Sequence, residues 1–159
     1  MNKIFLSYSL NEKTPSYGNK SKFLKKDVSI IGKNSLSNSS CIYMNCHLGT
    51  HIDFPYHFHS DGQTVDDYNA SFWFFENPKC IEVNHKSLLI GEELIEQLKP
   101  YERQNIDLLM VKTSFCKKRM SSDYWQKNPG FSSIVAKYLH KNFPLLRAFG
   151  MDTISLSSY

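Results

Sequence analysis

The chain has 159 residues, of which 41% are hydrophobic and 14% aromatic, and its formal net charge is +4. A chain of this length can bury a hydrophobic core, so the composition excludes disordered and fibrous proteins. The small excess of Lys and Arg is scattered along the sequence, and we therefore expect neither a nucleic acid nor a membrane as a partner.

The sequence carries no sign of export or membrane insertion. Its N-terminus lacks the apolar core of a secretory signal, and no apolar run approaches the roughly 20 residues that span a bilayer. The four cysteines form no CxxC pair, so we expect reduced thiols and no disulfide framework. These features predict a protein of the cytoplasm.

The first third of the sequence predicts β-strands. Apolar and polar residues alternate over residues 4–10, and the same two-residue period recurs at 28–30 and 42–46. This period is typical of half-buried strands. Turn-forming residues separate the segments, in a loop at 14–19 and a cluster at 32–35.

The remainder of the chain alternates predicted strands and helices. Apolar residues recur on one helical face before Pro100, and again after a serine N-cap at Ser132 or Ser133. The expected elements are a strand at 80–83, a helix at 91–98, a strand buried on both faces at 106–111, a helix at 131–140 and a strand at 146–154. Strands followed by alternating helices and strands predict an α/β or α+β domain with a mixed sheet.

A cluster of histidines between residues 47 and 59 is the most informative feature. His47, His51, Asp53 and His57 are separated by even numbers of residues. On an extended chain, such residues project from the same face. Three imidazoles and a carboxylate on one face predict a metal site.

That site requires a bend in the chain. A straight strand would hold His47 and His51 roughly 13 Å apart, too far to share one ion. Gly49 is the position where a bend costs least, because glycine adopts backbone conformations closed to other residues. The hydroxyl of Thr50 could bind a neighbouring backbone group. We therefore expect a kinked strand that leads into a loop.

The residue types indicate the chemistry. Imidazole nitrogens and a carboxylate are the ligands of catalytic zinc or manganese, and such an ion serves the hydrolysis of amides and esters. His57 follows the stiffening Pro55 and could act as general acid and base beside the metal instead of ligating it. We expect His59 to face solvent, and His85 and His140 to be structural.

The aromatic run at residues 71–75 has two interpretations. It could line a pocket for an aromatic substrate, with Trp73 as a substrate contact. Burial in the core is the simpler explanation, because large aromatic residues near a sheet are mostly packed for hydrophobic reasons. Tyr17, in the loop after the first predicted strand, is a second candidate substrate contact.

The segment His-Leu-Gly-Thr-His-Ile-Asp-Phe-Pro-Tyr-His-Phe, residues 47–58, is similar at every signature position to the HxGTHxDxPxHF motif of the metal-dependent cyclase family. The bacterial kynurenine formamidases are its best-known members. Weaker resemblances are colinear with this motif: a Pro-Ser-Tyr-Gly loop at 15–18, an Asn-Pro-Gly motif at 128–130 and a G-x-D-T-x-S segment within 149–155. Together they cover essentially the whole chain.

The resemblance implies an α/β fold of the swivelling β/β/α type, with a mixed sheet and flanking helices, and a homodimer or higher homo-oligomer. It implies a metal-dependent amidohydrolase, with N-formylkynurenine as the expected substrate and kynurenine and formate as products, a step of tryptophan catabolism. By position, His47, His51 and Asp53 would bind Zn²⁺, or Mn²⁺ as the alternative. His57 would pass a proton to the leaving amine after attack by metal-bound hydroxide.

One departure from the family concerns its later metal ligands. The family supplies a second His and a Glu after the G-x-D-T-x-S strand, within roughly fifty further residues, and this sequence ends at Tyr159. We therefore expect residues 1–159 to form a single cyclase-like domain without its C-terminal portion. Ligands from another chain, or one weakly held ion, are the alternatives. Two other functions stay open: a catalytically idle metal-binding assembly domain, and a hydrolase of another cyclic amide or ester.

Overall fold

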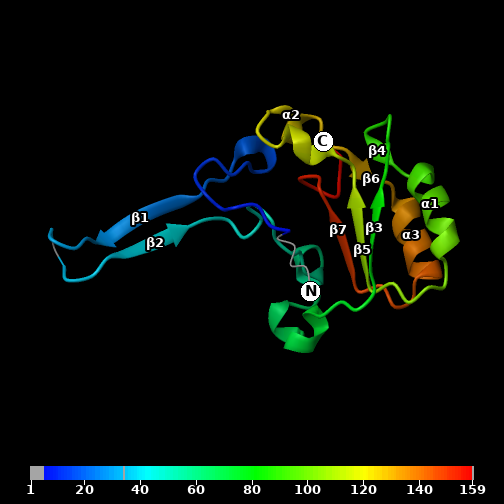
Figure 1. Cartoon of the computed structure of the whole chain (residues 1–159), viewed down its shortest axis with the longest axis horizontal. Helices are drawn as coiled ribbons and strands as arrows, with labels where there is room; N and C mark the ends of the chain where they lie inside the picture. The colour runs from blue at the N-terminus through cyan, green and yellow to red at the C-terminus, as the bar shows by residue number, and fades with distance from the viewer. Residues whose placement is uncertain (1–5, 34, 159) are drawn as a thin grey trace. The chain divides into compact units, whose positions relative to one another are not determined.

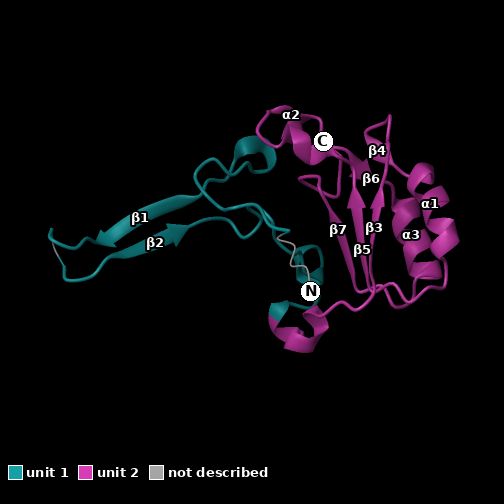
Figure 2. Cartoon of the chain, in the orientation of Figure 1, with its two compact units in different colours: residues 1–65 teal, residues 66–159 magenta. Residues whose placement is uncertain are grey.

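The computed structural model describes residues 6–33 and 35–158. The chain divides into two compact units, residues 1–65 and residues 66–159 (Figure 2). Parallel and antiparallel strand pairs occur together with a few short helices (Figure 1), which confirms the predicted mixed α/β class. The expectation of one domain without its C-terminal portion stays a prediction.

The first unit contains one antiparallel hairpin. Strand β1 (Leu24–Ser29) pairs with β2 (Ser39–Tyr43), with an irregularity in register between Asp27 and Ser29. The connection includes Gly32, whose φ of 79° suits the predicted turn. Two short 3-10 helices, η1 (Tyr17–Asn19) and η2 (Pro55–His57), also lie in this unit.

Two strand predictions in the first unit were wrong in extent. Residues 6–10 form no strand, and residues 4 and 5 of that predicted element lie outside the described part of the chain. The predicted strand at 42–46 ends at Tyr43, because the chain turns at residues 46 and 47. Alternation alone does not produce a strand where no neighbouring strand accepts its hydrogen bonds.

The second unit is built on a parallel sheet in the order β3-β5-β7. Strands β3 (Pro78–Glu82) and β7 (Ala148–Met151) flank β5 (Leu108–Lys112), as Figure 1 shows. The central strand is the one predicted to be covered on both faces, and its Leu109 and Val111 are 1% exposed. Gly150 lies opposite Met110, where an added Cβ would stand 3.3 Å from the Met110 side chain.

Helices α1 (Glu92–Leu98) and α3 (Ser133–Asn142) contact each other and supply the core beside this sheet. Ser132 caps α3 as predicted, by accepting a hydrogen bond from the Ile134 backbone N–H. The α-helix before Pro100 ends at Leu98 and continues as the 3-10 turn η5 (Lys99–Tyr101). Each predicted helix is confirmed to within two residues.

The remaining elements of the second unit are short. Strand β4 (Leu89–Ile90) pairs in parallel with β6 (Gly130–Phe131), and α2 (Asp123–Gln126) is a single turn. The 3-10 helices are η3 (Val65–Asp67), which crosses the unit boundary, η4 (Ala70–Trp73) and η6 (Phe115–Lys118). No helix among residues 6–33 and 35–158 has the length and apolar character needed to cross a bilayer.

The Asn-Pro-Gly motif has a structural role in the second unit. Asn128 is fully buried, and its amide nitrogen donates to the carbonyl oxygens of Ser155 and Ser157 at 3.1 and 2.8 Å. Its side-chain oxygen accepts from the Ile154 backbone N–H at 3.0 Å. A Cβ at Gly130 would lie 2.1 Å from the Ser158 nitrogen, so only glycine allows this approach of the C-terminal segment.

Candidate metal centre

The histidine segment leaves the hairpin through a tight bend. Beyond β2, residues 46–50 form turns and bends, and Gly49 has a φ of 76°. A Cβ on Gly49 would stand 2.4 Å from Leu10 Cδ2, so both backbone conformation and local space favour glycine. The bend predicted at Gly49 is confirmed. His47 lies in a turn rather than on a kinked strand, because β2 has already ended.

Thr50 contributes to this bend in a way that the sequence did not predict. Its hydroxyl oxygen accepts a hydrogen bond from the Tyr8 backbone N–H at 3.4 Å. We expected a partner close in the sequence, but Tyr8 is 42 positions away from Thr50. The hydroxyl therefore links two distant segments of the first unit.

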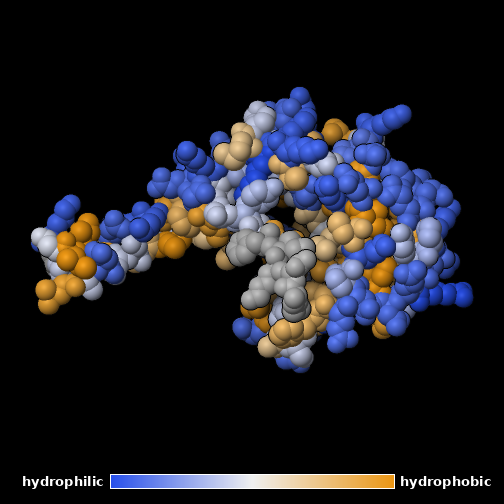
Figure 3. Space-filling model, viewed as in Figure 1, coloured by the Kyte–Doolittle hydropathy of each residue, from blue (hydrophilic) through white to orange (hydrophobic). Residues whose placement is uncertain are grey.

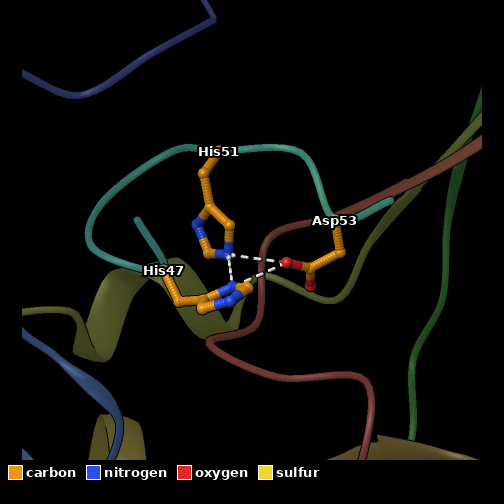
Figure 4. Close-up of side chains that lie close together, drawn as sticks. All are labelled: His47, His51 and Asp53. Carbon is orange, nitrogen blue, oxygen red and sulfur yellow. Dashed lines mark hydrogen bonds and ion pairs between the residues drawn. The ribbon is translucent and has the colours of Figure 1, made fainter. Parts of the chain in front are cut away.

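The bend brings three predicted ligands together (Figure 4). His47 Nδ1 lies 2.7 Å from Asp53 Oδ1 and 3.4 Å from His51 Nε2. His51 Nε2 lies 3.4 Å from the same Asp53 oxygen. One donor atom from each residue thus occupies a corner of a small triangle. All three residues are exposed, so a small ligand can reach the triangle.

Two of the three sides of this triangle fit a divalent transition metal, and the third, between His47 Nδ1 and Asp53 Oδ1, is 2.7 Å, a hydrogen-bond distance. Bonds of roughly 2.0–2.2 Å at tetrahedral angles separate donor atoms by about 3.3–3.6 Å, and two of the three distances here are 3.4 Å. A circle through the three donor atoms has a radius of about 1.9 Å, so an ion at ordinary bond lengths fits close to their plane. Two imidazole nitrogens and one carboxylate oxygen match the ligand preferences of Zn²⁺ and Mn²⁺.

A backbone carbonyl determines which nitrogen of His51 can bind a metal. His51 Nδ1 lies 2.9 Å from the carbonyl oxygen of Gly49. Because a carbonyl oxygen only accepts hydrogen bonds, Nδ1 is the protonated nitrogen. Nε2 therefore keeps its lone pair and faces the other two donors. Metal-binding histidines are commonly oriented by such a contact on the other ring nitrogen.

His57 lies beside the triangle without contributing a corner. It is the last residue of η2, where Pro55 occupies a first-turn position, and its backbone N–H donates to the Phe54 carbonyl oxygen at 2.9 Å. Its ring centroid is 3.9 Å from that of His47, and the two planes are tilted by 33°. This position matches the predicted proton-transfer residue beside a metal, and the role itself stays a prediction.

The other histidines lie outside the triangle. His59 is exposed, as expected. His85 contacts the Ser87 carbonyl oxygen at 2.9 Å through Nδ1. His140 lies in the last turn of α3, where the helix dipole would stabilise a cation. The structural roles expected of His85 and His140 stay predictions.

The predicted substrate contacts fall in different units. Tyr17 belongs to η1 of the first unit, whereas Trp73 belongs to η4 of the second, in a ring cluster with Tyr68 and Phe72. Trp73 is half-buried and Phe74 is 75% exposed, so the aromatic run is only partly packed. The contacts of Tyr17 and Trp73 with substrate stay predictions.

The sequence did not reveal the two residues that fix the aromatic run. Arg147 donates to the Phe72 and Phe74 carbonyl oxygens at 2.6 and 2.8 Å. Asp107 accepts from Arg147 at 3.2 Å and from the backbone N–H of Glu76 and Asn77. Each residue precedes a strand of the parallel sheet, and no local pattern connects positions 40 residues apart.

The fold and the triangle of donors define an α/β protein with a candidate metal centre. A family model described as "Putative cyclase" matches residues 4–158, and the chain belongs to this cyclase family. No protein of curated function matches the sequence.

Two solved structures share the fold. Isatin hydrolase A from Ralstonia solanacearum has a TM-score of 0.74 and 17% identity, and the match covers 96% of this chain and 67% of that one. An isatin hydrolase bound to the product analogue thioisatinate has a TM-score of 0.71 and 16% identity, with the same coverage of 96% and 67%. At such low identity, the likeness establishes a common fold.

Proposed function

We propose that this chain is a metal-dependent hydrolase of small amides. The observation that carries the proposal is the triangle formed by His47 Nδ1, His51 Nε2 and Asp53 Oδ1, with separations of 2.7, 3.4 and 3.4 Å. These residues would hold the ion, Zn²⁺ in the first instance and Mn²⁺ as the alternative. When bound, such an ion lowers the pKa of a coordinated water and polarises a carbonyl oxygen.

The histidines of the chain have distinct tasks in this proposal. His51 presents Nε2 because its Nδ1–H is held by the Gly49 carbonyl. His57, whose ring lies beside that of His47, accepts a proton at an imidazole nitrogen and returns it to the leaving amine. An amine leaves an acyl carbon readily only after it has been protonated, so this transfer is needed in amide hydrolysis. The net reaction adds water across the C–N bond.

Two substrate classes fit this chemistry. We propose N-formylkynurenine first, which would give kynurenine and formate. The second class is a cyclic amide, in which cleavage of the same bond opens the ring and leaves the acid and the amine in one molecule. The shared fold with two isatin hydrolases favours testing this class.

A metal-exchange experiment tests the proposal. The protein is stripped with a chelator, reloaded with Zn²⁺ or Mn²⁺, and assayed by absorbance against N-formylkynurenine and isatin. We expect turnover of one substrate that disappears on stripping and returns on reloading. Turnover unaffected by stripping would contradict the metal-dependent mechanism. Stoichiometric metal uptake without turnover of either substrate would instead support the idle metal-binding domain.

A further inference from the structure

His57 stands on a turn whose backbone is fixed at several points. The Pro55 carbonyl oxygen accepts hydrogen bonds from the backbone N–H groups of Phe58 and His59, at 3.1 and 3.0 Å. A Cβ on Gly62 would stand 2.5 Å from the Pro55 carbonyl carbon, so glycine allows the chain to return close to the turn. The backbone that carries the imidazole is therefore well defined, and the freedom that remains is rotation of the side chain.

Two neighbouring rings place the imidazole of His57. Its centroid lies 3.9 Å from that of His47 and 4.2 Å from that of Phe58, and the Phe58 ring is tilted by 60°. In the part of the chain that the structure describes, neither nitrogen of His57 forms a hydrogen bond. A histidine that acts as a base is often oriented by a hydrogen bond on its second nitrogen. Here ring contacts provide the orientation, and both nitrogens stay open to proton transfer.

Burial does not explain the presence of a phenyl ring at position 58. Phe58 is 74% exposed, so its ring adds little to a core. Figure 3 shows that apolar side chains also reach the surface along the hairpin of β1 and β2, and exposure alone therefore distinguishes no residue. Phe58 differs from these residues because its ring contacts the imidazole of the proposed proton-transfer residue. Tilted contacts between flat rings are favourable.

We propose that Phe58 is a positioning residue for His57. Its ring restricts rotation of the His57 side chain and keeps the imidazole beside His47. The inference rests on the proposed hydrolase function, in which His57 takes a proton from the attacking water and gives it to the amine nitrogen as the C–N bond breaks. Proton transfer requires hydrogen-bond reach, and a misplacement of about 1 Å can lower a rate by about 10². Phe58 acts through His57 and needs no contact with substrate.

Substitutions of Phe58 test this role in the full chain loaded with metal. Phe58→Leu removes the ring and keeps an apolar side chain, whereas Phe58→Tyr keeps the ring. On N-formylkynurenine or isatin, Phe58→Leu should lower kcat about ten- to a hundredfold, with KM and bound metal unchanged, and Phe58→Tyr should retain most of the rate. Parent-like kcat in Phe58→Leu would overturn the proposal. A raised KM with unchanged kcat would also overturn it, because that result indicates a substrate contact.

Tyr56→Leu is the matched control. Tyr56 belongs to the same 3-10 turn and is 59% exposed, and among the described residues its ring makes no contact with that of His57. This variant should keep the kcat of the parent chain. Equal losses in Tyr56→Leu and Phe58→Leu would indicate a general effect on the turn and would overturn the proposal.

A double substitution separates positioning from a merely structural role. If Phe58 acts only through the imidazole, its ring has no further effect once the imidazole is gone. The chain with both His57→Asn and Phe58→Leu should therefore be no slower than His57→Asn alone. Losses that multiply in the double variant would overturn the proposal.

Nuclear magnetic resonance tests the placement of the ring without any assay of turnover. In the metal-free chain, Overhauser contacts between the ring protons of His57 and His47 should be present in the parent and in Phe58→Tyr. They should weaken in Phe58→Leu, and equal contacts in all three chains would overturn the proposal. A parent chain that turns over neither substrate would contradict the proposed function. An active parent with an unaffected Phe58→Leu would contradict only the role of Phe58.

Discussion

His51 Nδ1 lies 2.9 Å from the carbonyl oxygen of Gly49, and this contact leaves His51 Nε2 as the nitrogen that faces His47 and Asp53. Gly49 adopts a positive φ of 76° at this bend, a backbone conformation that favours glycine. The contact thus connects the backbone at one glycine to the orientation of a histidine ring two residues later.

Substitution of Gly49 should weaken metal binding. Gly49→Ala forces a side chain into a positive φ and against Leu10, so the carbonyl that orients His51 has to move. We expect a loss of metal affinity of about tenfold or more, measured by calorimetric titration. Gly32→Ala is the matched control, because Gly32 has a φ of 79° and its Cβ would meet nothing within 4 Å. If both variants bind metal equally, the Gly49 carbonyl has no orienting role.

Removal of a triangle residue should abolish metal uptake. His51→Ala removes one of three donors, and two donors do not hold an ion against chelation by solvent and buffer. Metal content per chain, measured by mass spectrometry after dialysis, should fall from about one to near zero. His59→Ala, a change in the same exposed segment outside the triangle, should retain the metal. Retention of the ion in His51→Ala would refute the assigned ligand set.

His57 should affect turnover without affecting metal content. His57→Asn removes the imidazole that moves the proton but keeps Pro55 and the 3-10 turn. We expect kcat to fall by about 10² to 10⁴, the usual contribution of general acid–base catalysis, with bound metal unchanged. A substrate whose amine leaves without protonation should recover part of the rate. Loss of metal in this variant would instead make His57 a ligand.

The contacts of Asp107 should contribute to stability in a pH-dependent way. Burial alone would raise the pKa of Asp107, but the backbone N–H groups of Glu76 and Asn77 and the guanidinium of Arg147 outweigh burial and lower the pKa. A lowered folded-state pKa means that the stabilisation is present above about pH 4 and is lost as the pH falls through the folded-state value. Asp107→Asn should therefore lower the free energy of unfolding at pH 7 by about 2 kcal/mol.

Urea unfolding at a series of pH values measures this effect. The difference between the parent chain and Asp107→Asn should shrink as the pH falls below about 4. Asp123→Asn is the control, since the pKa of Asp123 is lowered by a hydrogen bond from Lys127, whose side chain is 63% exposed. Exposed ion pairs contribute little to stability, so this variant should unfold almost as the parent does. A pH-independent difference for Asp107→Asn would exclude an ionic origin.

The sequence by itself determined the elements whose formation depends on local periodicity. The apolar run at 106–111 predicted the central strand, and the stripes at 91–98 and 131–140 predicted the two helices, because side-chain period reports which face is buried. The even spacing of His47, His51 and Asp53, with glycine between the first two, predicted both the clustering of these three side chains and the bend that allows it. These features need only residues close in the chain.

Only the tertiary structure decided the features that join distant segments. Local periodicity does not specify which elements pack together. That packing determines the strand order β3-β5-β7, the ion pair between Asp107 and Arg147, and the hydrogen bonds of Asn128. Residues 6–10 have the pattern of a strand but no strand to pair with. The nitrogen of His51 that faces His47 and Asp53 was fixed by the direction of one carbonyl, a consequence of backbone dihedral angles that no spacing of residue types encodes.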